Sequence, residues 1–182
     1  MTGPADDISA RIARHYALTA QQGRVLQLLV VGRRNREIAL VLGIAVRTVR
    51  AHLAAIFAKT GIDGRDETSR LILEAHALEA RGRFPEHASV PPAQGLVDIT
   101  ALADDVAARI SRRYALTVRQ SRVLELLVVG RRNSEIALVL GIAAHTVRDH
   151  VSAILAKTDT AGRDEVCRLV LEEIALERNA YP

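Results

Sequence analysis

An internal duplication constrains this chain more than any other feature of its sequence. The segment YALTAQQGRVLQLLVVGRRNREIALVLGIAVRTVR returns as YALTVRQSRVLELLVVGRRNSEIALVLGIAAHTVR with nothing inserted or lost, so that Thr19 aligns with Thr117, 98 residues further on. An upstream match, DDISARIARHYA against DDVAARISRRYA, extends the repeat. Solenoid units are only about 20 to 50 residues long, so a repeat of this length predicts two copies of one globular domain.

The segment between the two copies has the composition of a linker. ARGRFPEHASVPPAQG holds three prolines and two glycines and shows no helical period, which is typical of a connecting segment. We therefore expect a first domain over residues 5–80, a linker over 81–98 and a second domain over 99–179.

Each copy opens with two amphipathic segments of helical spacing. Ile8, Ile12 and Tyr16 are four residues apart and predict a short leading helix. Thr19 and Gln22 then have the spacing of a capping box at the start of a second helix. The same patterns recur in the second copy at Val106, Ile110, Tyr114, Thr117 and Gln120.

The next segment has the steric pattern of a helix-turn-helix. Asn35 is expected to be the N-cap of a short helix that stops at Gly43, the residue type best suited to a left-handed turn. Ala39 supplies a small side chain where two helices cross, and Val49 begins the buried stripe of a third helix. That stripe continues through Leu53, Ile56 and Phe57, and the second copy repeats the pattern at Asn133, Ala137, Gly141 and Val147.

A last helix in each copy, RDETSRLILEAHALEA and RDEVCRLVLEEIALER, is apolar over much of its circumference. One domain of this size cannot bury so much apolar surface alone, so we expect this helix to be a pairing surface. The pairing could join the two copies of one chain or two separate chains. The residues assigned to it are Leu71, Ile72, Leu78, Leu169, Val170 and Leu176. The predicted fold is all-α, with two tandem four-helix domains that each carry an extra leading helix.

The segment LTAQQGRVLQLLVVGRRNREIALVLGIAVRTVRAHLAAIFAKTG resembles the LuxR-type helix-turn-helix of bacterial transcription regulators, also called FixJ-type, NarL-type or GerE-like. The resemblance covers about 65 residues of each copy. In that family the third helix enters the major groove of double-stranded DNA and the fourth usually mediates dimerisation. The family is usually joined to a receiver or ligand-sensing domain, and this sequence shows neither.

The resemblance implies a set of DNA-contacting residues in each copy. It assigns base-edge contacts to Arg50, Ala51 and Ala54 in the first copy and to Arg148, Asp149 and Ser152 in the second. It assigns phosphate contacts to Asn35, Thr48, His52, Lys59, Asn133, Thr146, His150 and Lys157, with Arg47 and His145 at the border of the same surface. The pairs Arg33 with Arg34 and Arg131 with Arg132 are either further phosphate contacts or a solvated turn.

The two copies differ in charge on this surface. Residues 33–65 carry seven basic and two acidic side chains, whereas residues 131–163 carry five and three, so the first copy is expected to hold DNA more strongly. Asp149 leaves two interpretations open. Its carboxylate could accept a hydrogen bond from cytosine N4, or its charge could mark a copy that has lost DNA affinity. In the second case the copy would serve as a pairing or partner-binding module.

The remaining features mostly exclude functions. A net charge of +4 is compatible with an anionic partner, and three Tyr, two Phe and no Trp argue against stacking on single strands. Cys167 is the single cysteine. The sequence shows no nucleophile with a neighbouring base, no cluster of metal ligands and no phosphate-binding loop. We therefore expect no enzymatic activity, no metal site and no cofactor. The acidic N-terminus and the lack of a long apolar run predict a cytoplasmic, nucleoid-associated protein. The alternative function is a protein-interaction adaptor, an anti-activator or a polymerase-binding protein, in which one or both DNA-reading surfaces are lost. Its partner would be RNA polymerase or another regulator.

Overall fold

The computed structural model describes residues 4–80 and 99–180, and the predicted linker over 81–98 lies outside them. Every regular element in the described part is a helix, which confirms the all-α prediction. The first copy contains α1 (Pro4–His15), α2 (Ala20–Val30), α3 (Asn35–Leu42), α4 (Val46–Thr60), a 3-10 turn η1 (Arg65–Glu67) and α5 (Thr68–Ala80). The second contains α6 (Thr100–Arg113), α7 (Val118–Val128), α8 (Asn133–Leu140), α9 (Ala144–Lys157), η2 (Arg163–Glu165) and α10 (Val166–Ala180).

The first two helices of each copy form as their patterns predict. Ile8 and Ile12 are buried, while Tyr16 is half-buried just beyond the last residue of α1. At the start of α2, Thr19 Oγ1 accepts a hydrogen bond from the Gln22 backbone N–H, and Gln22 Oε1 accepts one from the Thr19 backbone N–H. Thr117 and Gln120 repeat both bonds before α7, so the capping boxes are confirmed.

The helix-turn-helix geometry is present in both copies. The chain turns by 109° between α3 and α4 and by 110° between α8 and α9, inside the range of about 90–120° for this motif. Gly43 and Gly141 adopt φ values of 64° and 63° at the two turns, and Val49 is completely buried behind the first. No single helix among the described residues is long and apolar enough to cross a membrane.

The expectation that Asn35 and Asn133 are N-caps is wrong. The cap positions are Arg34 and Arg132, and Asn35 is the first residue inside α3. The Arg34 backbone N–H donates to Glu37 Oε2 at 2.7 Å, so a residue inside the helix satisfies the cap. Asn35 Oδ1 instead accepts a hydrogen bond from Arg65, a distant residue that the local pattern could not reveal.

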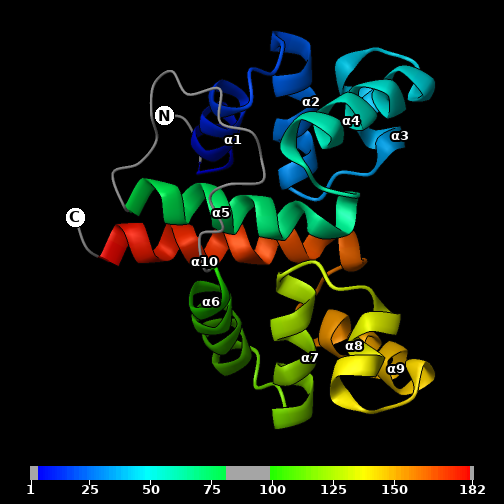
Figure 1. Ribbon diagram of the computed structural model, residues 1–182, viewed down its shortest axis with the longest axis vertical. Coiled ribbons are helices and arrows are strands. Elements are labelled where there is room, and N and C mark those ends of the chain that lie inside the picture. The colour runs from blue at the N-terminus through cyan, green and yellow to red at the C-terminus, as the bar shows by residue number, and fades with distance from the viewer. Residues whose placement is uncertain (1–3, 81–98, 181–182) are drawn as a thin grey trace.

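The last helices of the two copies, α5 and α10, lie side by side and run in the same direction, with the remaining helices of each copy on opposite sides of them (Figure 1). Leu71, Ile72, Leu169 and Val170 are buried, and Leu78 is half-buried. Leu176 departs from the expectation, since 47% of it is exposed. Helices α1, α2, α5, α6 and α7 all contact α10, but they cover only part of its circumference, and Leu176 lies largely on the uncovered part.

Equivalent residues of the two copies contact each other reciprocally at one end of this helix pair. Arg65 Nε lies 3.4 Å from Asp164 Oδ2, and Arg163 Nε lies 3.3 Å from Asp66 Oδ1. A Cβ placed on Gly130 would lie 2.9 Å from Glu67 Cα, and one placed on Gly32 would lie 3.1 Å from Glu165 Cα. Reciprocal contacts of this kind are the property of a two-fold symmetric interface.

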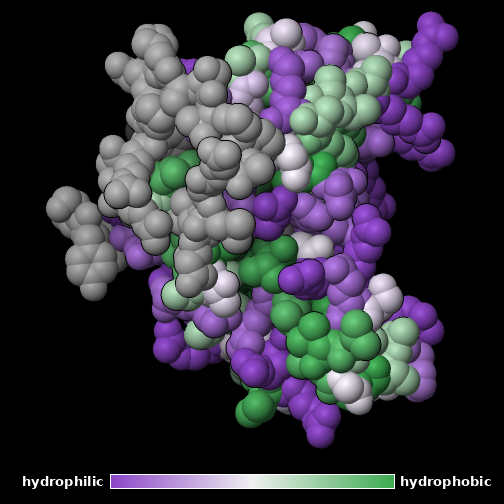
Figure 2. All heavy atoms as spheres, viewed as in Figure 1, coloured by the Kyte–Doolittle hydropathy of each residue, from purple (hydrophilic) through white to green (hydrophobic). Residues whose placement is uncertain are grey.

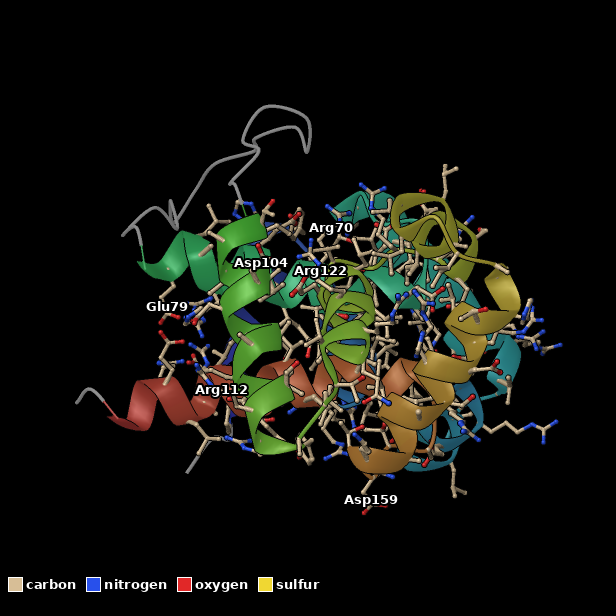
Figure 3. The ribbon with its side chains drawn as sticks, turned by 90° about the horizontal axis from the view of Figure 1, so that it is seen from below. Arg70, Glu79, Asp104, Arg112, Arg122 and Asp159 are labelled. Atoms are coloured by element: carbon tan, nitrogen blue, oxygen red, sulfur yellow. The ribbon has the colours of Figure 1, made fainter. Side chains whose placement is uncertain are left out.

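Some side-chain contacts between the described parts of the two copies have no equivalent. Arg178 of α10 lies 2.8 Å from Asp7 of α1 and 3.6 Å from Glu79 of α5, and Figure 3 shows Glu79 pointing between the far ends of α5 and α10. Cys167 Sγ lies 3.7 Å from the Leu29 carbonyl oxygen of the other copy, and burial raises the pKa of its thiol to about 12. The thiol is therefore protonated and acts as a packing group.

A half-buried histidine also lies at the junction of the two copies. Burial lowers the pKa of His76, an effect opposed by the charges of Glu177 and Glu79 and reinforced by those of Arg11 and Arg178. Its Nδ1 atom is buried without a hydrogen-bond partner, 4.0 Å from Glu79 Oε2. In the second copy the equivalent residue is Ile174, which is buried and apolar.

We expect the free energy of unfolding to decrease as the pH falls from 7 to 5. The unfolded His76 binds a proton more readily than the folded one, so acid favours the unfolded state. Chemical denaturation at several pH values measures this, and His76→Ile should give a shallower pH dependence. His15, whose pKa burial also lowers, accounts for part of the remaining slope. An unchanged slope in His76→Ile would contradict the assignment.

Candidate nucleic-acid interface

Helix α4 presents a row of side chains outward because its opposite face is fixed to the core. Val49 and Ile56 are completely buried and Leu53 is almost so. On the other side of the helix Arg47 and Arg50 are exposed, and Thr48 and His52 are half-buried beside them. Ala51 and Ala54 complete the exposed face.

Helix α9 presents the equivalent face of the second copy. Val147 and Ile154 are completely buried, while the residues exposed on the other side are His145, Arg148, Asp149 and Ser152, with Thr146 and His150 half-buried. In Figure 1, α4 and α9 lie on the same side of the molecule, on either side of the α5 and α10 pair. Helices α4 and α9 are the third helices expected to enter the major groove, and we call them the reading helices. The structure brings them to one side of the chain and leaves their arginines accessible.

The arginines before α3 and α8 are exposed but partly engaged. Arg33 Nη1 lies 3.0 Å from Glu37 Oε1, and Arg131 makes the same contact with Glu135 at 3.2 Å. Hydrogen bonds from the Arg34 backbone N–H and the Arg33 guanidinium lower the pKa of Glu37, so it stays charged. The Arg34 guanidinium donates to the Ala161 carbonyl oxygen of the second copy at 3.4 Å. These arginines lie beside the exposed faces of the reading helices, and their bonds also stabilise the turns before α3 and α8.

Four predicted phosphate-contacting residues have structural partners. Lys59 Nζ donates to the Ala17 carbonyl oxygen at 2.7 Å and to Gln22 Oε1 at 3.2 Å, which ties the end of α4 to the corner between α1 and α2. Lys157 repeats these bonds in the second copy, and Asn133 Oδ1 accepts from Arg163 just as Asn35 does from Arg65. An ammonium group has three donors, so each lysine keeps one for a phosphate, and both are exposed.

Sequence reasoning missed several surface residues near the reading helices. Arg36 is exposed on α3, and its equivalent in the second copy is Ser134. Leu40 and Val41 of α3 are 84% and 61% exposed, and Leu138 and Val139 of α8 are exposed to almost the same degree. Figure 2 shows apolar side chains gathered over the region of α8. The sequence does contain this exposed apolar pair, because Leu40 and Val41 directly follow Ile38 and Ala39, the buried residues of α3.

The exposed groups of this surface suit contacts with nucleic acid. Within residues 4–80 and 99–180, no group of three or more His, Cys, Asp or Glu side chains could hold a metal ion. The exposed groups of α4 are guanidiniums and methyl groups, which suit phosphate oxygens, guanine edges and thymine methyls.

Comparison with known proteins gives two matches to regulators. The family described as "Bacterial regulatory proteins, luxR family" matches this chain twice, over residues 16–72 and 114–170. The "Uncharacterized transcriptional regulatory protein YhcZ" of Bacillus subtilis (strain 168) is 44% identical to this chain over 52 residues, which are 29% of this chain and 24% of that protein. The chain therefore matches only about a quarter of the length of this relative. No solved structure matches it.

Proposed function

The chain belongs to the luxR family of bacterial regulatory proteins, and from that premise we propose that it regulates transcription by binding double-stranded DNA sequence-selectively through α4 and α9. The observation that carries the proposal is the outward placement of Arg50 and Arg148 at equivalent positions of two helices whose opposite faces are buried. A guanidinium so placed can bond to guanine O6 and N7 in the major groove.

We further propose that the two domains act as a covalent pseudo-dimer. The α5 and α10 pair, with the reciprocal contacts of η1 and η2, supports this because one chain then contains the two-fold arrangement that separate subunits usually form. Each reading helix would enter one of two successive major grooves, which are about 34 Å apart. Tethering gives the second domain an effective concentration on the order of millimolar, so two weak half-sites suffice.

A nucleoid-type role follows if several chains assemble on DNA. If α5 of one chain paired with α10 of a second chain in place of its own, one particle would hold four reading helices and could bridge or coat DNA. Sedimentation of the chain alone and with a duplex of one or two sites distinguishes this arrangement from a monomeric pseudo-dimer.

The affinity for duplex DNA should fall steeply with salt, and Arg50→Ala should weaken binding about 10- to 100-fold, because one bidentate base contact contributes about 1–3 kcal/mol. Arg148→Ala should behave similarly. Fluorescence anisotropy with a labelled duplex across a salt series measures both effects. The matched control is Arg24→Ala, which removes the same charge from the exposed surface of α2; equal losses in Arg24→Ala and Arg50→Ala would reject α4 as the reading helix.

A second function, contact with a protein such as RNA polymerase or another regulator, is favoured by the exposed Leu40, Val41, Leu138 and Val139. These aliphatic residues are adjacent in pairs on α3 and α8, and contiguous exposed apolar patches often mark sites of protein contact. This adaptor function is compatible with DNA binding by α4. It becomes the main function if the folded chain shows no salt-dependent affinity for any duplex.

A further inference from the structure

We propose that the two domains divide the work of recognition. The first domain anchors the chain on the duplex mainly by charge, and the second selects the sequence, with Asp149 as the group that requires a base amino group in the major groove. The target would then be directional, with two unequal half-sites. This inference rests on the proposed function and adds which domain confers specificity.

Three of the six differences between the reading helices lie on their exposed faces. Arg50, Thr48 and His52 of the first copy have identical equivalents in Arg148, Thr146 and His150, with the same burial. The exposed positions that change are Arg47 to His145, Ala51 to Asp149 and Ala54 to Ser152. The second copy thus has a carboxylate and a hydroxyl where the first has two methyl groups, so its capacity to read hydrogen-bonding patterns is greater.

The first copy has the stronger attraction to phosphates. Its exposed Arg36 and Arg47 correspond to Ser134 and His145 in the second copy. Each phosphate neutralised adds about 0.9 to the slope of log affinity against log salt. Ala51 and Ala54 offer only apolar contact, so α4 can tolerate many base sequences while its arginines hold the backbone.

The second copy keeps the arginines that would hold it on the duplex. Arg131, Arg132 and Arg148 are exposed in the same way as Arg33, Arg34 and Arg50, and the turn before α8 repeats the Arg131 to Glu135 ion pair. A copy that served only as a pairing module would need no such outward surface. This favours selection over loss of DNA binding as the role of Asp149.

The Asp149 carboxylate is available for a ligand. It is exposed on α9 next to Arg148, and among the described residues it has neither an ion pair nor a hydrogen bond. In the major groove a carboxylate accepts from cytosine N4 or adenine N6, whereas guanine O6 and thymine O4 are acceptors that repel it. Asp149 therefore selects mainly by rejecting bases that lack an amino group there.

Selection from a library of random duplexes, performed with the full chain, tests this division. The unaltered chain should select a non-palindromic site, with one half-site that requires cytosine or adenine at a single position by at least about tenfold. Asp149→Ala should lose that requirement while its affinity for random duplex rises severalfold. Ala51→Asp should impose a similar requirement on the other half-site and weaken binding overall.

Asp63→Ala is the control for charge alone, because Asp63 is an exposed carboxylate outside both reading helices. It should raise general affinity without changing any base preference. A palindromic selected site, or unchanged preferences in Asp149→Ala, would overturn the division of labour while leaving DNA binding intact. If no variant, nor the unaltered chain, bound duplex DNA in a salt-dependent way, the proposed function itself would fail.

Discussion

Gly130→Ala is expected to destabilise the protein by about 2–5 kcal/mol and to weaken the contact between its two domains. Gly130 has a φ of 89°, which costs an L side chain about 1–2 kcal/mol. Its new Cβ would also lie 2.9 Å from Glu67 Cα, a backbone atom of the other copy. The domains must move apart to relieve that overlap, and overpacking of this kind costs a further 1–3 kcal/mol, approximately.

Gly141→Ala is the matched control for this variant. Gly141 also has a left-handed φ, 63°, but a Cβ there would meet nothing within 4 Å. Its substitution should therefore cost only the strain of a left-handed backbone, about 1–2 kcal/mol of folding stability. Urea unfolding measures the stability of both variants, and small-angle scattering measures whether the radius of gyration grows. Equal stability losses in both variants and an unchanged radius would show that the close approach at Gly130 does not hold the domains together.

Glu173→Ala is expected to cost about 2–4 kcal/mol of folding stability. Glu173 is only 3% exposed, and its Oε1 lies 2.6 Å from Arg113 Nη1 while its Oε2 lies 3.7 Å from Arg109 Nε. Removing one partner of a buried ion pair typically costs about 3–5 kcal/mol because the other charge is left uncompensated. The expected loss is somewhat smaller because Arg113 is partly exposed and Arg109 keeps Glu177 at 3.0 Å.

The first copy supplies the control for Glu173. Its equivalent residues are Ala75, which is buried, and His15 in place of Arg113. The double variant Glu173→Ala with Arg113→His reproduces that arrangement, so it should be more stable than Glu173→Ala alone by at least about 1 kcal/mol. Thermal and urea unfolding of the single and double variants gives the coupling energy. A double variant no more stable than Glu173→Ala would mean that the ion pair does not account for the loss.

Local patterns were sufficient for the helices and for the reading face. The Thr19 and Gln22 capping box, the left-handed Gly43 and the buried Val49 were all predicted from spacing. Each depends on residues three or four positions apart or on the backbone preference of one residue, and such interactions are complete within a helix or its turn. The exposure of Arg50 follows from the same periodicity, because the stripe that buries Val49 leaves Arg50 outside.

The tertiary structure alone decided how the two copies meet. The sequence predicted that α5 and α10 would pair, but it left open whether they pair within one chain. It did not indicate that Gly130 would approach Glu67, that Asn35 would accept a hydrogen bond from Arg65, or that Leu176 would remain exposed. The first two outcomes join residues that are 63 and 30 positions apart. All three depend on the packed shape of the domains, which leaves no period in the sequence.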